Sequence, residues 1–430
     1  MPVFNAGVGS SSITPKTGAA LVGYFNRPGG AQGVHDNLLA RALVLDDGAR
    51  AVAICSVELL WLWASIVADI REDVARRCAL APENILICCT HTHAGAAPHN
   101  AADWDTPLAG RIADAIVAAY DSRRPARIGF GFGQLFGYSI NRRWLNRPAD
   151  PSVGVMRVDT HDGAPLAVVS NYACHAVVMG YDNYLISGDW PGYSSRLLEA
   201  ELGCAALFTQ GGAGDVNPLT ETVRQRLAAG HTVGTIGELT SYYGQYRQGD
   251  PEAWNIEDRA GGTFLECETL ARAVNAEVLR VWRAIATTAS AALWTERIIV
   301  NAAAGPDEAP PEGLPPDYHG YLPEIEPGSI PLEIMLLGVG QAVLTTQPGE
   351  VFSETAVELR KAAQQMGFAF PWLVSYANGS YAYLPPANAF DEGGYEVAWA
   401  RRIGLSRHMQ NRIAERVLPA LRQRAPARAT

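Results

Sequence analysis

Short apolar runs alternate with amphipathic stretches along most of this chain. Runs with the length of buried strands occupy residues 42–45, 51–55, 85–89, 166–172, 205–208, 330–337, 342–345 and 372–376. Stretches with apolar residues three and four positions apart, which is the spacing of an amphipathic helix, occupy residues 66–78, 108–120, 194–202, 265–285, 353–365 and 406–422. Strands interleaved with helices in this way predict a mixed, layered α/β fold in which sheets pack against helices.

Two segments interrupt this alternation. Residues 219–262 are mostly polar but carry several tyrosines, and residues 303–327 are rich in proline. The first segment follows a glycine-rich loop and is long for a connection, so it predicts either a lid over a site or a surface insertion. The sequence contains no internal repeat.

The bulk composition limits the classes of protein to consider. Of the 430 residues, 48% are hydrophobic and 18% are charged, so a large core can form. The net charge is -10 without a basic block, which argues against a nucleic-acid partner. The apolar run 51–68 is interrupted by Ser56, Glu58 and Ser65, so it predicts a strand and a helix and not a membrane anchor. No export signal is visible, which predicts a cytoplasmic protein.

The seven cysteines lie mostly in or near apolar runs. An odd number of cysteines in such positions favours buried free thiols in a reducing compartment over a disulfide framework. The sequence has no pair of cysteines separated by two residues, so a thiolate zinc site is not expected.

The strongest chemical signal is the pair His91 and His93, which follows the apolar run 85–89. Neutral imidazole is the commonest metal ligand in proteins, and the end of a buried strand can aim it into a cleft. In an extended chain, residues two apart point to the same face. The pair is therefore either a ligand or catalytic pair, or two core or surface histidines. His175 follows the run 166–174 in the same manner.

Three further motifs follow apolar runs. The glycine-rich loop 211–214 precedes Asp215 but lacks the residues of a phosphate-binding loop. Glu350 stands after a predicted strand, where an ordinary first-turn helix acid is the simpler interpretation. Tyr381, Tyr383 and Tyr395 lie in loops rich in glycine and proline, and each alone is typical of a structural residue.

Taken together, these motifs resemble the neutral/alkaline, non-lysosomal ceramidase family, specifically its N-terminal catalytic domain. The segments that carry the resemblance stand in the family's order over most of the chain: Gly33-Val34-His35-Asp36, Thr90-His91-Thr92-His93-Ala94-Gly95, Asn141-Arg142, Ser187-Gly188-Asp189, Gly214-Asp215-Val216-Asn217-Pro218 and Pro348-Gly349-Glu350. The resemblance implies that residues 1–430 form a single catalytic domain. The family's C-terminal β-rich domain is not expected here.

The resemblance also implies a set of site residues. In the family, two histidines, a glutamate and a tyrosine hold one zinc ion, and the matching positions are His91, His175, Glu350 and Tyr383, with Tyr381 as the alternative tyrosine. The positions that line the substrate carbonyl in the family correspond to His93, Arg142 and Tyr395. Asp189 or Asp215 is expected either to orient a ligand histidine or to cap a loop.

The expected chemistry is hydrolysis of an amide bond. Zinc lowers the pKa of bound water and polarises the carbonyl, and the other groups can donate hydrogen bonds to the oxyanion. The family carries a serine, proposed as a nucleophile, where this chain has Asn217, and an amide cannot act in that way. A metal-activated water is therefore the natural nucleophile. The differences from the family favour a small soluble substrate over long-chain ceramide.

Three alternatives remain open at this stage. The same metal could serve hydrolysis of an ester, a lactone or a glycosidic bond. The protein could instead bind metal and a small molecule without catalysis, or use the loop 211–214 in a nucleotide-dependent reaction. Trp61 and Trp63 are expected to pack in the core, while His35 and His99 are expected near the cleft. The sequence does not decide the oligomeric state.

Overall fold

The structure is a computed structural model that describes residues 3–24, 27, 29–144, 146–228, 261–308 and 328–426. The predicted lid or insertion, residues 219–262, lies outside the described residues except for its two ends. Most of the proline-rich segment 303–327 also lies outside them.

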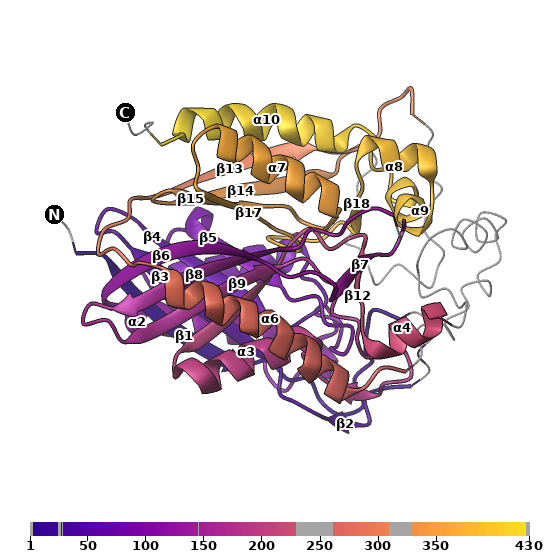
Figure 1. Cartoon of the computed structure of the whole chain (residues 1–430), viewed down its shortest axis with the longest axis horizontal. Helices are drawn as coiled ribbons and strands as arrows, with labels where there is room; N and C mark the ends of the chain where they lie inside the picture. Colours follow the sequence, from indigo (N-terminus) through magenta and orange to yellow (C-terminus); the bar gives the residue numbers. More distant parts are fainter. Residues whose placement is uncertain are drawn as a thin grey trace.

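Two β-sheets face each other across the centre of the molecule (Figure 1). The larger sheet has the strand order β11-β9-β8-β6-β1-β3-β4-β5. Its strands are β1 (Asn5–Ser12), β3 (Leu39–Asp46), β4 (Ala51–Val57), β5 (Ile85–Cys89), β6 (Arg124–Gln134), β8 (Ser152–Thr160), β9 (Pro165–Tyr172) and β11 (Ala205–Gln210). The smaller sheet has the order β13-β14-β15-β17, with strands β13 (Leu293–Asn301), β14 (Pro331–Val339), β15 (Ala342–Thr346) and β17 (Phe370–Val374).

Helices cover the outer faces of both sheets. On the larger sheet lie α1 (Ala64–Arg77), α2 (Leu108–Asp121), α3 (Asp189–Leu202) and α6 (Phe264–Ala284), and on the smaller sheet lie α7 (Ser353–Gln365) and α10 (Met409–Arg424). Buried side chains of both sheets, including Leu45, Leu86, Met335 and Trp372, fill the space between them. The order of layers is thus helix, sheet, sheet, helix, and the predicted mixed α/β fold is confirmed.

The apolar runs located eight strands of the two large sheets correctly. The other four strands of these sheets, β1, β6, β8 and β13, were not predicted, and neither were the described strands of two or three residues. Strand β6 carries glycine at alternate positions, and a Cβ atom at Gly129 would lie 2.4 Å from the backbone oxygen of Ala286. In β1, a Cβ atom at Gly9 would lie 2.3 Å from the backbone oxygen of Ala115 in α2. These glycines let helices approach the sheet closely, and they also dilute the apolar pattern that reveals a strand.

Short elements gather at one end of the molecule, beyond the ends of the long strands (Figure 1). They are β2 (Gly33–Val34), β7 (Ser139–Asn141), β10 (Leu185–Ile186), β12 (Val216–Pro218), β16 (Glu350–Val351), β18 (Tyr383–Leu384), α4 (Glu221–Ala228), α8 (Ala387–Glu392) and α9 (Tyr395–Arg402). Two 3-10 turns, Pro82–Asn84 and Ala101–Asp103, complete the described elements. Most of the motifs singled out in the sequence lie in these short elements or in the loops between them.

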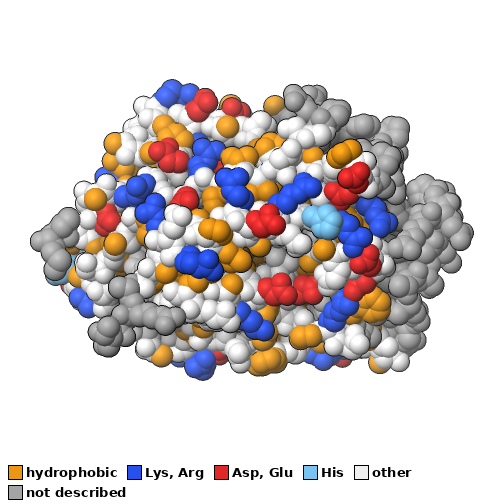
Figure 2. All heavy atoms as spheres, turned by 90° about the horizontal axis from the view of Figure 1, so that it is seen from above, with side chains coloured by type: hydrophobic (Ala, Val, Ile, Leu, Met, Phe, Trp, Pro, Cys, Tyr) orange, Lys and Arg blue, Asp and Glu red, His pale blue; other side chains and the backbone are white. Residues whose placement is uncertain are grey.

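The surface and the helices add two observations. The face formed by α7 and α10 carries positive and negative side chains interspersed with one another (Figure 2). Among the described residues, no helix combines the length and the apolar character that crossing a membrane requires.

The seven cysteines, all of them described, are free thiols, and burial raises the pKa of Cys55, Cys88 and Cys174.

Candidate metal and catalytic site

The predicted site residues come from strand ends in both sheets. His91 follows β5 and His175 follows β9 of the larger sheet, while Glu350 follows β15 of the smaller one. The parallel pair of β16 and β18 places Glu350 opposite Tyr383. Residues far apart in the sequence therefore meet where the two sheets end together.

Each of the three histidines uses its Nδ1 atom to contact a backbone carbonyl oxygen. His91 Nδ1 lies 2.8 Å from Leu60 O, and His93 Nδ1 lies 3.1 Å from Gly23 O. His175 Nδ1 lies 2.5 Å from Ala213 O. A carbonyl oxygen can only accept a hydrogen bond, so Nδ1 carries the proton in each ring. The three Nε2 atoms therefore present lone pairs.

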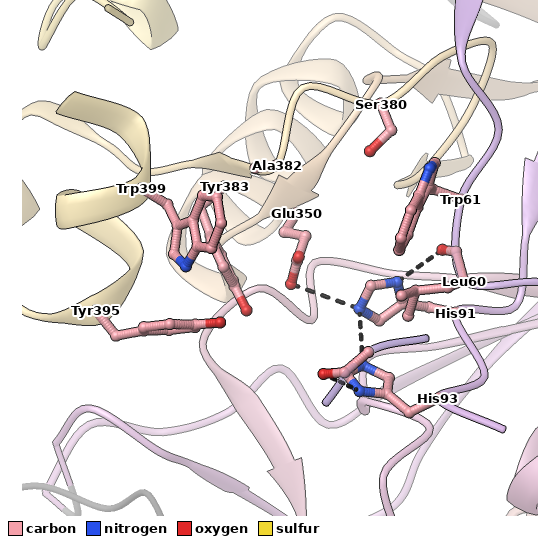
Figure 3. A pocket seen from close by; sticks show the side chains of 11 residues that line it. Leu60, Trp61, His91, His93, Glu350, Ser380, Ala382, Tyr383, Tyr395 and Trp399 are labelled. Atoms are coloured by element: carbon pink, nitrogen blue, oxygen red, sulfur yellow. Dashed lines mark hydrogen bonds and ion pairs between the residues drawn. The ribbon is translucent and has the colours of Figure 1, made fainter. Parts of the chain in front are cut away.

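These lone pairs converge on one point together with the carboxylate of Glu350. His91 Nε2 lies 3.3 Å from His93 Nε2 and 3.6 Å from Glu350 Oε2 (Figure 3). Glu350 Oε2 also lies 3.0 Å from His175 Nε2. Ligating nitrogens of the three histidines all lie within 4.8 Å of one another. Ligands about 2.1 Å from a tetrahedral zinc are roughly 3.4 Å apart. The donor set and its spacing therefore fit a zinc ion.

The protonation states at this cluster suit a cation. Burial, with the nearby charge of Arg142, lowers the pKa of His175 to about 4, so its imidazole is neutral at pH 7. Burial by itself would raise the pKa of Glu350, but His91 and His175 outweigh it and hold that pKa well below its usual range. Neutral imidazoles and an ionised carboxylate are the ligand forms that zinc requires.

His93 lies beside the predicted ligands. The resemblance implies that it lines the substrate carbonyl, and in the structure its Nε2 lies 3.3 Å from His91 Nε2, next to the position that the metal would occupy. Arg27 donates a hydrogen bond to its backbone oxygen, and the ring of Tyr24 lies 5.0 Å from its ring. This N-terminal segment, which the sequence analysis did not connect with the site, holds His93 in place.

A cavity of about 60 Å³ opens above the cluster. Its walls are aromatic, and Figure 3 shows Tyr383, Tyr395 and Trp399 on one side and Trp61 on the other. Both candidate tyrosines belong to the same hydrophobic cluster, but of the two only Tyr383 is among the described residues that line the cavity. Burial, together with the Glu350 charge, raises the pKa of Tyr383, so its hydroxyl is neutral in the metal-free protein.

The tryptophan pair was predicted only to pack in the core. Both side chains do contribute to a small apolar cluster, but Trp61 also lines the cavity. Trp63 stacks on the ring of His99 at 4.4 Å. His35 pairs with Asp36 and stacks on Phe264, outside the residues that line the cavity. No sequence signal indicates that Trp61 lines the cavity, because core and cavity positions share the same apolar pattern.

Arg142 and Tyr395 lie next to the cavity. The Arg142 guanidinium lies 5.3 Å from the ring centre of Tyr383 and 6.0 Å from that of Tyr395. Its Nη1 atom lies 3.5 Å from Oδ1 of Asn217, the residue at the family's serine position. The structure therefore brings Arg142 close both to Tyr395, which lines the cavity, and to Asn217.

The two aspartates support loops and contact no ligand imidazole through any described hydrogen bond. Asp189 accepts backbone N–H groups of Val178, Met179 and Trp190, and Asp215 accepts one from Ser353. Burial raises the pKa of each to about 6. Their influence on His175 passes through the backbone, so the loop-capping interpretation describes both.

Asp215 lies in a loop that joins three parts of the site. Its other carboxylate oxygen accepts from Asn141, whose neighbour is Arg142. The same loop supplies the carbonyl that orients His175, and Gly214 donates a hydrogen bond to Val351 O, next to Glu350. This explains why glycines are needed here, since a Cβ atom at Gly214 would lie 2.4 Å from Glu350 O.

Sequence reasoning missed Tyr376. Its ring stacks on His91 with centres 4.0 Å apart, and it is buried with a left-handed backbone at φ 53°. Burial, followed by the Glu350 charge, raises the pKa of Tyr376. The only available signal was its place at the end of the run 372–376, which is also the signal of an ordinary core residue.

A comparison with known protein families shows which family this chain belongs to. The family model described as neutral/alkaline non-lysosomal ceramidase, N-terminal, matches residues 4–226 of the 430. The chain belongs to this ceramidase family.

Individual relatives support this assignment. Neutral ceramidase B of Dictyostelium discoideum is 31% identical over 258 residues, which are 50% of this chain and 36% of that protein. The neutral ceramidase of Mycobacterium tuberculosis is 28% identical over 260 residues, 50% of this chain and 40% of that protein. The matched stretches thus span well under half of these ceramidases.

Solved structures extend the likeness of fold to the whole chain. The neutral ceramidase from Pseudomonas aeruginosa matches with a TM-score of 0.75 and 20% identity, covering 100% of this chain and 76% of that one. A ceramidase complexed with C2 matches with the same TM-score at 19% identity. The ceramidase fold therefore includes the C-terminal half, which the family model does not match.

The low pKa of His175 predicts a pH dependence of stability in the metal-free protein. Below its ordinary pKa of 6.5, this histidine takes up a proton in the unfolded chain but stays neutral in the fold down to about pH 4. Stability is therefore full above pH 6.5 and falls as the pH drops toward 4. Thermal melts should show a shallower fall for His175→Gln than for the exposed control His161→Gln. If the stability of both variants falls equally steeply with pH, His175 is not the group that causes the pH dependence.

Gly23 should be required for the position of His93. A Cβ atom at Gly23 would lie 2.4 Å from His93 Nδ1, and its φ of 104° already disfavours other residues. Gly23→Ala should therefore weaken metal binding, measured by competition with a chromogenic chelator, by roughly 10-fold or more. Gly18→Ala is the matched control, because Gly18 has a similar φ of 94° with nothing within 4 Å. Equal affinity in the two variants would show that Gly23 has no such role.

Proposed function

We propose that this protein is a zinc-dependent hydrolase that cleaves an amide bond of a small soluble substrate. The observation that carries the proposal is the convergence of three imidazole lone pairs and a carboxylate beneath an aromatic cavity. Such groups repel one another unless a cation lies between them. Family membership supports the class of reaction, because the relatives are ceramidases.

The residues present fit the metal that the family implies. His91, His175 and Glu350 would hold the zinc, with Tyr383 as the proposed fourth ligand and His93 beside them. When bound, zinc supplies a Lewis acid that lowers the pKa of water and polarises a carbonyl group. The Nδ1 hydrogen bonds to Leu60, Gly23 and Ala213 keep the histidines aimed without reorganisation.

The other residues of the cavity would stabilise negative charge on the carbonyl oxygen. Arg142 brings a permanent positive charge to this side, and the Tyr395 hydroxyl points into the cavity (Figure 3). Donors held in place before the reaction stabilise an oxyanion strongly, with one such donor worth about 100-fold or more in rate. The aromatic walls also lower the polarity beside these groups, which strengthens their electrostatic interactions.

Asn217 supports water as the nucleophile. Its amide lies 3.5 Å from Arg142 Nη1, so it reaches the same side of the site as the proposed oxyanion donors. An amide side chain has no ionisable group to attack a carbonyl carbon. A water molecule held beside Glu350 and the histidines would serve as the nucleophile, so the reaction requires no serine.

The size of the cavity supports a small substrate. A cavity of about 60 Å³, partly open to solvent, accommodates a short acyl group next to the cluster without movement of its walls. Trp61 and Trp399 close the cavity on two sides (Figure 3), so a short acyl group fits better than a long chain. The ceramide implied by the names of the relatives is therefore one member of the substrate panel, beside short N-acyl amides, esters, lactones and glycosides.

Metal analysis tests the core of the proposal. Protein purified without chelators should contain one zinc per chain, and His91→Ala should lose both the zinc and turnover while its circular dichroism spectrum stays unchanged. His99→Ala is the control, since His99 stacks on Trp63 outside the donor cluster. A wild-type protein without a transition metal would overturn the proposal. A zinc-loaded protein inert toward the whole panel would favour the non-catalytic alternative.

Trp61 should limit the length of the acyl group. Trp61→Leu enlarges the cavity, so kcat/KM should rise for longer acyl chains relative to acetyl, by about fourfold for each added methylene that becomes buried. Trp63→Leu is the matched control, because Trp63 packs on the same cluster without lining the cavity. An unchanged chain-length preference in Trp61→Leu would show that Trp61 does not set it.

A further inference from the structure

A buried carboxylate stands between two arginines at the edge of the cavity. Glu396, 1% exposed, follows Tyr395 in the first turn of α9. Its Oε1 accepts a hydrogen bond from Arg142 Nε at 2.8 Å, and its Oε2 accepts one from Arg143 Nη1 at 2.7 Å. Burial by itself would raise the pKa of Glu396, but the two guanidinium charges outweigh it and lower that pKa.

The bond to Arg142 determines which part of that side chain can reach the site. Because the Nε–H group donates to Glu396, other contacts of Arg142 are made by its terminal nitrogens, of which Nη1 lies 3.5 Å from Oδ1 of Asn217. The guanidinium is held beside the rings of Tyr383 and Tyr395, which line the cavity and lie 5.4 Å from each other. Arginine has a long side chain with large rotamer entropy, so one charged bond at Nε fixes much of its orientation.

The second bond anchors Glu396 to a separate support. Arg143 also donates to Gly393 O at 2.8 Å and to Glu392 at 3.3 Å. Gly394, with φ 96°, lets this turn approach, since a Cβ atom there would lie 3.0 Å from Arg143 Nη1. Glu392 in turn accepts hydrogen bonds from Trp144 and Arg147 but has no described bond to Arg142. The cluster therefore contains one carboxylate that touches the site arginine and one that does not.

We propose that Glu396 is a positioning residue that aims Arg142 at the carbonyl oxygen of the substrate. The inference rests on the proposed function, because Arg142 is assigned there to the oxyanion. Glu396 acts through Arg142 and couples it to the helix that carries Tyr395, so the two proposed donors keep one geometry. The hydrogen bond from Arg143 keeps the Glu396 carboxylate in place, so that Glu396 can in turn orient Arg142.

The test compares Glu396→Gln with Glu392→Gln in the zinc-loaded protein. The glutamine keeps the shape of the side chain but loses the charge, so Arg142 is held less firmly. We expect Glu396→Gln to lower kcat by about 10-fold to 100-fold, with KM within about twofold and the zinc content unchanged. Glu392→Gln should stay within about threefold of wild-type kcat, because it only loosens the support.

A double-mutant cycle with Arg142→Gln separates positioning from a general structural effect. If Glu396 acts through Arg142, adding Glu396→Gln to Arg142→Gln should lower kcat by less than about twofold more. Additive losses, equal losses in the two single glutamate variants, or wild-type kcat in Glu396→Gln would each overturn the inference while leaving the proposed function standing. A zinc-loaded wild-type protein without hydrolase activity would instead overturn the proposed function.

Discussion

The hydrogen bonds from three histidine Nδ1 atoms to backbone carbonyls are the constraint on which the site depends. They fix the tautomer and the direction of each ring, and they leave the Nε2 lone pairs of His91, His93 and His175 aimed at one point. Without a cation this arrangement is electrostatically unfavourable, so the rest of the fold has to hold it together. The left-handed backbone of His91, at φ 68°, belongs to the same constraint.

The surrounding structure maintains this arrangement through buried polar groups that are each satisfied by the backbone. The carbonyls that receive the histidines come from the loop after β4, the segment around Gly23 and the loop 211–216. Asp189 and Asp215 hold two of the site loops by accepting backbone N–H groups. Burial raises the pKa of both carboxyl groups to about 6, so keeping them ionised at neutral pH lowers the stability of the fold. This cost indicates that they serve to hold the geometry of the site loops.

The charged groups on the other side of the cavity follow the same principle. Arg142 contributes a buried positive charge near the cluster, and the chain balances it with Glu396 instead of leaving it to solvent. Glu396 directly follows Tyr395 in α9. This one helix therefore carries both the Tyr395 hydroxyl and the carboxylate that orients the Arg142 guanidinium. Family membership explains the shared framework. Around the site, Trp61 lines the cavity, Tyr376 stacks on His91, and Asn217 lies 3.5 Å from Arg142 Nη1.

The sequence by itself determined the class of fold, the strands with continuous apolar runs and the set of chemical groups at the strand ends, because periodicity and residue type are local properties. It did not reveal glycine-diluted strands such as β6, since those glycines are explained only by the helix that packs on them. Nor did it reveal that Trp61 lines the cavity, that Tyr376 stacks on His91, or that Glu396 pairs with Arg142. Tertiary structure alone decided these contacts, because they join segments distant in sequence whose approach depends on how the two sheets pack.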